Sequence, residues 1–163
     1  MKTLYIIRHA KSSWAGFNQT DHERQLSETG REHIQKIVEF LRTKAVRPQV
    51  ILASSARRTI DTARWLSDGL GLKEEIIKSE PALYLADEEK ISEEIGLQSD
   101  DFNQLMVIGH NPGITDFVNL FLKNPIDLLP TSAVVCFTFD TTEWENFRHK
   151  EAQLQFIVFP KEL

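Results

Sequence analysis

The chain has 163 residues, of which 41% are hydrophobic and 26% charged, and its 19 Lys and Arg against 24 Asp and Glu give a formal net charge of −5. These proportions are those of a globular protein and exclude a disordered chain, and the length predicts one domain spanning residues 1–163. The net negative charge argues against a nucleic-acid-binding protein, because such binding depends on clustered cations that meet many phosphates. It leaves room for a local site that binds a single phosphate group.

Cysteine content and hydropathy indicate where the protein works. Cys136 is the only cysteine, so no intramolecular disulfide can form, which is typical of a reducing compartment. The apolar run after Thr3 is four residues long, too short for the apolar region of a signal peptide. The stretch Ala133–Phe139 is far shorter than a membrane span. We therefore expect a soluble cytoplasmic protein with no membrane partner.

The first part of the chain predicts a strand, a loop and a helix. Leu4–Arg8 is a short apolar strand, and a loop rich in small, polar and charged residues follows from Ala10 to about Leu26. Ser27 is a suitable helix cap. Four apolar residues then recur at the spacing of one helical face: Ile34, Ile37, Val38 and Leu41.

The rest of the chain alternates between predicted strands and predicted helices. Strand-like or β-rich segments cover Val50–Ala53, Glu75–Lys78, Leu105–Ile108, Ala133–Phe139 and Leu154–Phe159. Helices are predicted from about Ala56 to Leu70, from Asp87 to Leu97, and from Asn111 and Pro112 onward, with Ile114, Phe117, Val118 and Phe121 on one face. We place Asn111 at the cap and Pro112 at the first position of that last helix. The alternation predicts an α/β fold, a three-layer α/β/α sandwich with a mostly parallel central sheet.

Polar residues follow three of the predicted strands. Arg8-His9 ends the first strand, Ser54-Ser55 follows the second with Arg57-Arg58 just beyond, and Gly109-His110 ends the fourth. The carboxyl ends of parallel strands meet at one edge of a sheet, so these side chains are expected to converge. Converging cations with no matching carboxylates favour a bound anion, and the planar guanidinium suits phosphate oxygens.

These segments carry a resemblance to a known family. Arg8-His9-Ala10-Lys11 resembles the RHG signature of the histidine phosphatase superfamily, whose fold is phosphoglycerate mutase-like, with Ala in place of Gly. The segment Ser54–Ala63 resembles the superfamily pattern S-x-x-x-R-x-x-x-T-A. His110 after its strand is similar to the second catalytic histidine of the superfamily. The three segments come in the order of the family and span most of the chain.

Within the superfamily, the chain resembles the small SixA-like phosphohistidine phosphatases. Arg8–Trp14 is similar to a common form of their first motif. Asp21–Gly30 resembles their D-x-x-R-P-L-x-x-x-G segment, with Gln25 in place of Pro, and Thr131-Ser132-Ala133 resembles a short motif before a late strand. Only 51 residues separate Arg58 from His110, where mutases and larger phosphatases carry a longer insertion.

The resemblance, together with the chemistry of the side chains, implies roles for five residues. His9 is the predicted nucleophile, a neutral imidazole that forms a transient phosphohistidine, while its other ring nitrogen donates to a backbone carbonyl. Arg8, Arg58 and His110 are expected to bind the phosphoryl oxygens. Arg24 either reaches the same phosphate from its loop or is a solvated loop cation. Neither a metal site nor a cofactor is predicted.

A proton donor for the leaving group is the least defined part of the site. Larger family members carry a Glu after the third strand, and Glu80 lies near that position, with Asp21 and Asp87 as rivals. Each is more simply explained as an exposed carboxylate, since such residues are mostly on the surface. A phosphohistidine substrate relaxes the need for a donor, because its imidazole leaving group has a conjugate-acid pKa of roughly 6.5. The prediction is a phosphatase acting on phosphohistidine in a protein. The alternatives are a phosphatase or mutase for a small phosphate ester, such as a sugar or glycerate phosphate, and a phosphate-binding module without catalysis. The sequence leaves the oligomeric state open.

Overall fold

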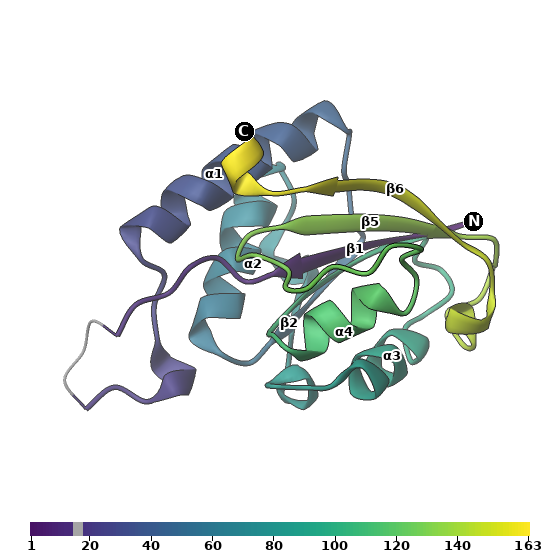
Figure 1. The fold of residues 1–163 in the computed structure, drawn as a ribbon, viewed down its shortest axis with the longest axis horizontal. Helices are drawn as coiled ribbons and strands as arrows, with labels where there is room; N and C mark the ends of the chain where they lie inside the picture. Colours follow the sequence, from purple (N-terminus) through teal and green to yellow (C-terminus); the bar gives the residue numbers. More distant parts are fainter. Residues whose placement is uncertain (15–17) are drawn as a thin grey trace.

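A six-stranded sheet runs through the centre of the molecule with helices on both of its faces (Figure 1). The structure is a computed structural model, and it describes residues 1–14 and 18–163. Residues 15–17 of the predicted first loop lie outside this range. The strands are β1 (Lys2–Arg8), β2 (Val50–Ser54), β3 (Ile77–Glu80), β4 (Gln104–Gly109), β5 (Val134–Phe139) and β6 (Ala152–Val158). The helices are α1 (Glu28–Thr43), α2 (Arg57–Gly69), α3 (Glu88–Gly96) and α4 (Gly113–Asn119).

The sheet is mixed but mostly parallel, as the sequence predicted. Its strand order is β3-β2-β4-β1-β5-β6. The pairs β3/β2, β2/β4 and β4/β1 are parallel, and the last two strands of the chain add antiparallel to β1 and to each other. The alternating strands and helices of the first two thirds therefore build the parallel part, and the closing β-rich segments form a hairpin at one edge.

Alternate residues of the strands feed two separate hydrophobic cores. On one face, Leu4 and Ile6 of β1 pack in a cluster with residues of α3 and α4. On the other face, Tyr5 and Ile7 pack in a cluster with residues of α1 and α2. Figure 1 shows the two helix pairs on opposite sides of the sheet. The inner strands β1, β2, β4 and β5 are buried on both faces, which explains why their sequences are largely continuous apolar runs. The edge strands β3 and β6 are more exposed.

Several predicted boundaries differ from the structure. The last strand begins two residues earlier than predicted, at Ala152, and α4 ends at Asn119, before Phe121. The third strand begins two residues later than predicted, at Ile77, because Glu74–Ile76 form a turn of 3-10 helix. The last helix begins at Gly113, with Pro112 rather than Asn111 at the cap position. The side chain of Asn111 instead donates to the carbonyl of Leu129 and accepts from the hydroxyl of Thr115, so it does not cap a backbone N–H.

The register of the parallel strands brings their carboxyl ends to one edge of the sheet. Arg8 of β1 lies opposite Gly109 of β4, and Ser54 of β2 lies opposite Glu80 of β3. Each strand therefore ends at the same level, and the residues that follow emerge side by side. Across residues 1–14 and 18–163, no helix is long and apolar enough to span a membrane.

Candidate active site

A cavity of about 500 Å³ opens at this edge of the sheet. Its lining comes from the end of β1, from the segments that follow β1 and β4, and from α1 and α2. The residues are Arg8, His9, Lys11, Ser12, Arg24, His33, Arg58, Leu85, His110, Asn111 and Thr131. The structure thus brings together all five residues predicted to bind or attack a phosphate, Arg24 included. None of these described lining residues is an Asp or a Glu, so the cavity is strongly cationic.

His9 is held as a neutral imidazole. Its side chain lies almost wholly inside the protein, and its Nδ1 is 2.8 Å from the carbonyl oxygen of Ala10. A carbonyl can only accept, so Nδ1 carries the proton, as predicted, and Nε2 keeps its lone pair. Burial and the nearby guanidinium groups lower the pKa of His9 to about 4, although the hydrogen bond to Ala10 acts in the opposite direction. At neutral pH, this imidazole is uncharged and able to act as a nucleophile.

The ring of His110 faces that of His9, with 5.3 Å between the centroids. Its Nδ1 lies 3.1 Å from Nη2 of Arg58, and its Nε2 lies 2.6 Å from Oγ of Ser54. A guanidinium can only donate, so Nδ1 is the acceptor and Nε2–H donates to the serine. Burial is the main cause that lowers the pKa of His110 to about 3, followed by the charges of its neighbours. His110 is therefore also neutral.

Three arginines supply the positive charge of the cavity. Arg8 donates from Nη1 to the carbonyl of Leu129 at 3.0 Å. Arg58 is almost fully buried and donates from Nη1 to the carbonyl of Asp21 at 2.8 Å. Arg24 lies over the ring of Trp14, 4.5 Å from its centroid. The buried Nε group of each arginine has no acceptor among the described residues. Buried donors without acceptors are costly, so the cluster favours an anion that accepts from it.

Asp21 joins two of these arginines from outside the lining. Its Oδ1 is 3.2 Å from Nη1 of Arg24, and its Oδ2 is 3.2 Å from Nη2 of Arg58. The hydroxyl of Tyr84 also donates to Oδ2. This hydrogen bond, with the contacts to the two arginines, lowers the pKa of Asp21 to about 2. Asp21 is thus an ionised acceptor at neutral pH and carries no proton to donate.

The other candidate proton donors lie apart from the cavity. Glu80 ends β3 and is not among the described residues that line it. Asp87 caps α3, where its carboxylate accepts from the backbone N–H of Lys90 at 2.9 Å. The structure therefore places no carboxylic acid at the cavity wall in the part of the chain that it describes.

Sequence reasoning assigned no individual role to three residues that support the site. Tyr84 holds Asp21, and its ring packs edge-on against His110 at 5.5 Å between centroids. Ser54 accepts from His110, and the hydroxyl of Thr62 accepts from the backbone N–H of Ala10 at 2.9 Å. Ser54 and Thr62 belong to the S-x-x-x-R-x-x-x-T-A pattern, which therefore held a signal for both. Tyr84 follows β3 in a loop, and no pattern marked it.

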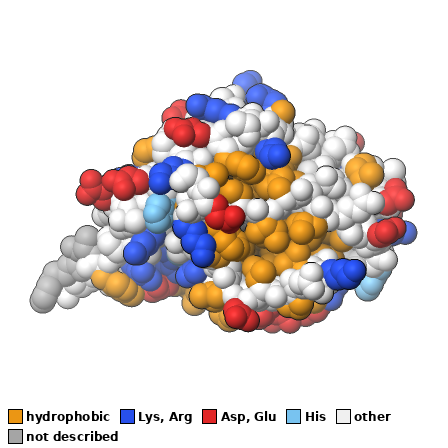
Figure 2. Space-filling view, turned by 45° about the horizontal axis from the view of Figure 1, so that its top comes forward, with side chains coloured by type: hydrophobic (Ala, Val, Ile, Leu, Met, Phe, Trp, Pro, Cys, Tyr) orange, Lys and Arg blue, Asp and Glu red, His pale blue; other side chains and the backbone are white. Residues whose placement is uncertain are grey.

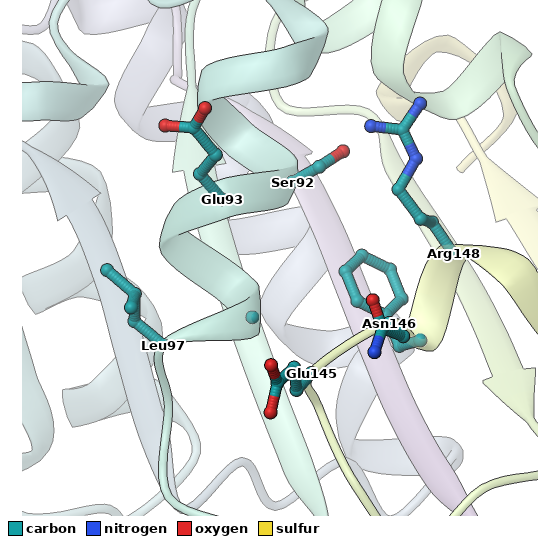
Figure 3. Close-up of a pocket in the computed structure, with 8 residues that line it drawn as sticks. Ser92, Glu93, Leu97, Glu145, Asn146 and Arg148 are labelled. Carbon is teal, nitrogen blue, oxygen red and sulfur yellow. The ribbon is translucent and has the colours of Figure 1, made fainter.

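A larger pocket, of about 650 Å³, lies between α3 and the turn Phe147–His149 (Figure 3). In Figure 3, Glu93 and Ser92 point from the helix and Arg148 points from the turn. Arg148 is paired with Glu89 at 2.7 Å. This pocket contains none of the predicted site residues, and its lining has two Glu side chains for one Arg, so the smaller cationic cavity is the better candidate for binding a phosphate. In the described ranges, no group of three or more His, Cys, Asp or Glu is placed to hold a metal ion.

Together, fold and site define an α/β protein with a cationic pocket and two neutral histidines at the carboxyl ends of parallel strands. The family model for the histidine phosphatase superfamily (branch 1) matches residues 4–83, the part that contains Arg8, His9, Arg24 and Arg58. The match covers 80 of the 163 residues, slightly under half of the chain, and it supports phosphatase or mutase chemistry of the kind that this superfamily implies.

Comparisons with individual proteins show what the chain is similar to. An uncharacterized chloroplastic protein of Arabidopsis thaliana is 28% identical over 153 residues, which cover 89% of this chain and 70% of that protein. A crystal structure assigned as the phosphohistidine phosphatase SixA of Agrobacterium tumefaciens aligns with a TM-score of 0.79 at 22% identity, covering 96% of this chain and 97% of the other. The protein histidine phosphatase SixA complexed with tungstate aligns with a TM-score of 0.82 at 21% identity, covering 98% of both chains. At these identities, the structural likeness establishes the fold.

Proposed function

We propose that the protein is a phosphatase that uses His9 as its nucleophile and acts on phosphohistidine in a protein. The observation that carries this proposal is a neutral imidazole with a free Nε2 at the wall of a cavity that holds Arg8, Arg24 and Arg58. An imidazole nucleophile and guanidinium groups for the oxygens are what phosphoryl transfer through a covalent intermediate requires. The cytoplasmic location expected from the sequence stays a prediction.

The reaction has two displacement steps. In the first, the lone pair on Nε2 of His9 forms a bond to phosphorus, while the bond from phosphorus to the leaving nitrogen breaks. That nitrogen keeps the electron pair and takes a proton from solvent. In the second step, water attacks phosphorus and loses its proton to solvent. The bond to Nε2 breaks, and inorganic phosphate leaves with His9 neutral again. Arg8, Arg24 and Arg58 stabilise the charge on the transferring oxygens, and losing one such donor typically costs about 2.7–4 kcal/mol in the barrier.

The absence of an acid at the cavity wall supports a phosphorus–nitrogen substrate. When an alkyl phosphate ester is cleaved, the alcohol leaves as an alkoxide, and this leaving group needs a proton from a positioned acid. Asp21 is ionised, and Glu80 does not line the cavity among the described residues. An imidazole leaving group, with a conjugate-acid pKa of roughly 6.5, needs no such help. The cavity therefore favours phosphohistidine over a small phosphate ester such as a sugar or glycerate phosphate.

Trapping the intermediate tests the proposal. The protein is incubated with a peptide that carries phosphohistidine, quenched in alkali and examined by mass spectrometry for phosphate on His9. We expect the His9→Ala variant to lose turnover by at least about 10³-fold and to carry no label. His149→Gln is the matched control, because His149 is exposed and lies outside the cavity. Undiminished turnover by His9→Ala would overturn the mechanism. Turnover of glycerate or sugar phosphates without turnover of the peptide would replace the proposed substrate.

A further inference from the structure

We infer that the mouth of the cavity holds a second anion-binding subsite, formed by Lys11 and His33, for a carboxylate or second phosphate close to the transferable phosphoryl group. The inference rests on the proposed function, because it concerns the rest of the same substrate. It narrows the substrate class to phosphorylated molecules that carry another negative group nearby.

The shape and lining of the cavity give the first reason. The arginines and the two histidines that would contact a phosphoryl group make up only part of the lining. The remainder consists of Lys11, Ser12, His33, Leu85, Asn111 and Thr131. Only Leu85 among them is apolar, so this outer part offers hydrogen bonds and positive charge rather than an apolar wall. A polar group of the substrate fits it better than a hydrocarbon or an aromatic ring.

The charge balance gives the second reason. The lining contains four Lys and Arg side chains and no Asp or Glu among the described residues. Asp21 compensates one charge through Arg24 and Arg58, and a phosphoryl group brings about −1.5 to −2 at neutral pH. One positive charge remains, and the ammonium group of Lys11 has no ion pair or hydrogen bond with any described residue. A second negative group on the substrate would balance it.

The backbone around Lys11 is fixed before any substrate arrives. The carbonyl of Lys11 accepts from the backbone N–H of Ser27 at 2.8 Å and from its hydroxyl at 3.1 Å. Gly30 lies so close that an added Cβ would sit 2.1 Å from the same carbonyl oxygen. His33 follows on the next turn of α1, so both members of the subsite are anchored to the start of one helix. A subsite on a fixed backbone loses less entropy on binding.

Basic side chains gather at one end of the molecule. Figure 2 shows Lys and Arg side chains beside a histidine toward the left end of this face, with acidic side chains next to them and hydrophobic side chains over its middle. Such a local cationic mouth on an acidic protein attracts a substrate with extra negative charge and raises its rate of encounter.

Matched substrates test the subsite in the full-length protein. One pair is two phosphohistidine peptides that differ only by Asp or Asn beside the phosphorylated residue. The other pair is phenyl phosphate and its 3-carboxy derivative. The readout is the ratio of kcat/KM for the anionic member to kcat/KM for the neutral member. We expect Lys11→Met to lower this ratio about three- to fivefold, mainly through KM, as befits a partly exposed charge pair.

Three further variants make the outcome decisive. Lys11→Arg should keep the ratio, because it keeps the charge, and His33→Gln should lower it less than Lys11→Met does. Lys36→Met is the matched control on an exposed part of α1 outside the cavity, and it should leave the ratio unchanged.

A response with the peptides alone assigns the anion to a protein side chain, and a response with the aryl phosphates alone assigns it to a small molecule. Wild-type hydrolysis of all substrates with an unresponsive ratio overturns the subsite. Failure to hydrolyse any of them overturns the proposed function instead.

Discussion

The imidazole of His9 owes its neutral state to the same groups that would hold the substrate. The guanidinium charges of Arg8, Arg24 and Arg58 add to burial in lowering its pKa to about 4. They disfavour a fourth positive charge on His9, and they attract a phosphoryl group to the same place. The carbonyl of Ala10 fixes the tautomer and leaves Nε2 unprotonated. Nucleophile and anion binder are thus compatible, because the cations prevent the protonation that would disable the imidazole.

The Tyr84 hydroxyl should affect phosphate binding through Asp21. In Tyr84→Phe, Oδ2 of Asp21 loses a hydrogen bond and keeps only Arg58, while the ring contact with His110 can stay. We expect the inhibition constant of inorganic phosphate to rise about two- to tenfold, since a hydrogen bond to a charged group contributes about 1.5–3 kcal/mol and only part of it reaches the arginines. Tyr5→Phe is the control, because its hydroxyl bonds Gln104 away from the cavity. Equal inhibition constants for the two variants would contradict a positioning role for Tyr84.

The ends of the parallel strands determine where the site lies, and the residues at these ends could largely be predicted from the sequence. Apolar runs located β1, β2 and β4, and the polar residues after each run gave Arg8, His9, Arg58 and His110, which the structure places around one cavity. A parallel register needs only local strand patterns and short right-handed connections, so it follows from the order of the elements.

Contacts between loops could not be predicted in the same way. Asp21 and Tyr84 are 63 positions apart and meet only because their loops fold over the same edge of the sheet. No periodic sequence pattern predicts a contact between two such loops. From the sequence, Asp21 is therefore a candidate acid, whereas its three partners in the structure keep it ionised. Arg24 was ambiguous for the same reason. Its place at the cavity depends on Trp14 and Asp21, which no local rule connects to it.

The close packing of the first loop against α1 depends on Gly30. An added Cβ would lie 2.1 Å from the carbonyl oxygen of Lys11, so Gly30→Ala must push the loop away from the helix. We expect it to lower the free energy of unfolding by about 1–3 kcal/mol, measured by urea denaturation. In Gly96→Ala, the new Cβ would meet only the carbonyl of Trp144 at 3.8 Å, and the protein should keep its stability. Equal stability of the two variants would show that the loop yields without cost.

The molecule as a whole separates its charges. Its net charge of −5 argues against an extended polyanion as a partner, yet the cavity gathers four Lys and Arg side chains without a described carboxylate in its wall. The surplus acid lies elsewhere, for example on α3, where Glu88 and Glu89 occupy the first turn. A net charge therefore describes the long-range field of the protein and says little about one pocket. An acidic surface around a cationic mouth is compatible with a single phosphorylated group and disfavours a long polyanion.

The same buried histidines predict how stability depends on pH. The pKa values of His9 and His110 fall from 6.5 in the unfolded chain to about 4 and about 3 in the fold, so the folded protein binds fewer protons in acid. Their contribution to stability is complete above pH 6.5 and is lost as the pH falls toward 4. Asp21 adds a further loss of stability in the same direction below its unfolded pKa of 3.8.

Urea denaturation at pH 7, 5.5 and 4.5 should show the free energy of unfolding falling at each step. The fall should be shallower in His9→Gln, which removes one of the two titrating groups, and unchanged in His149→Gln, whose histidine is exposed. A His9→Gln protein that loses stability as steeply as the wild type would mean that His9 is not held neutral by the fold.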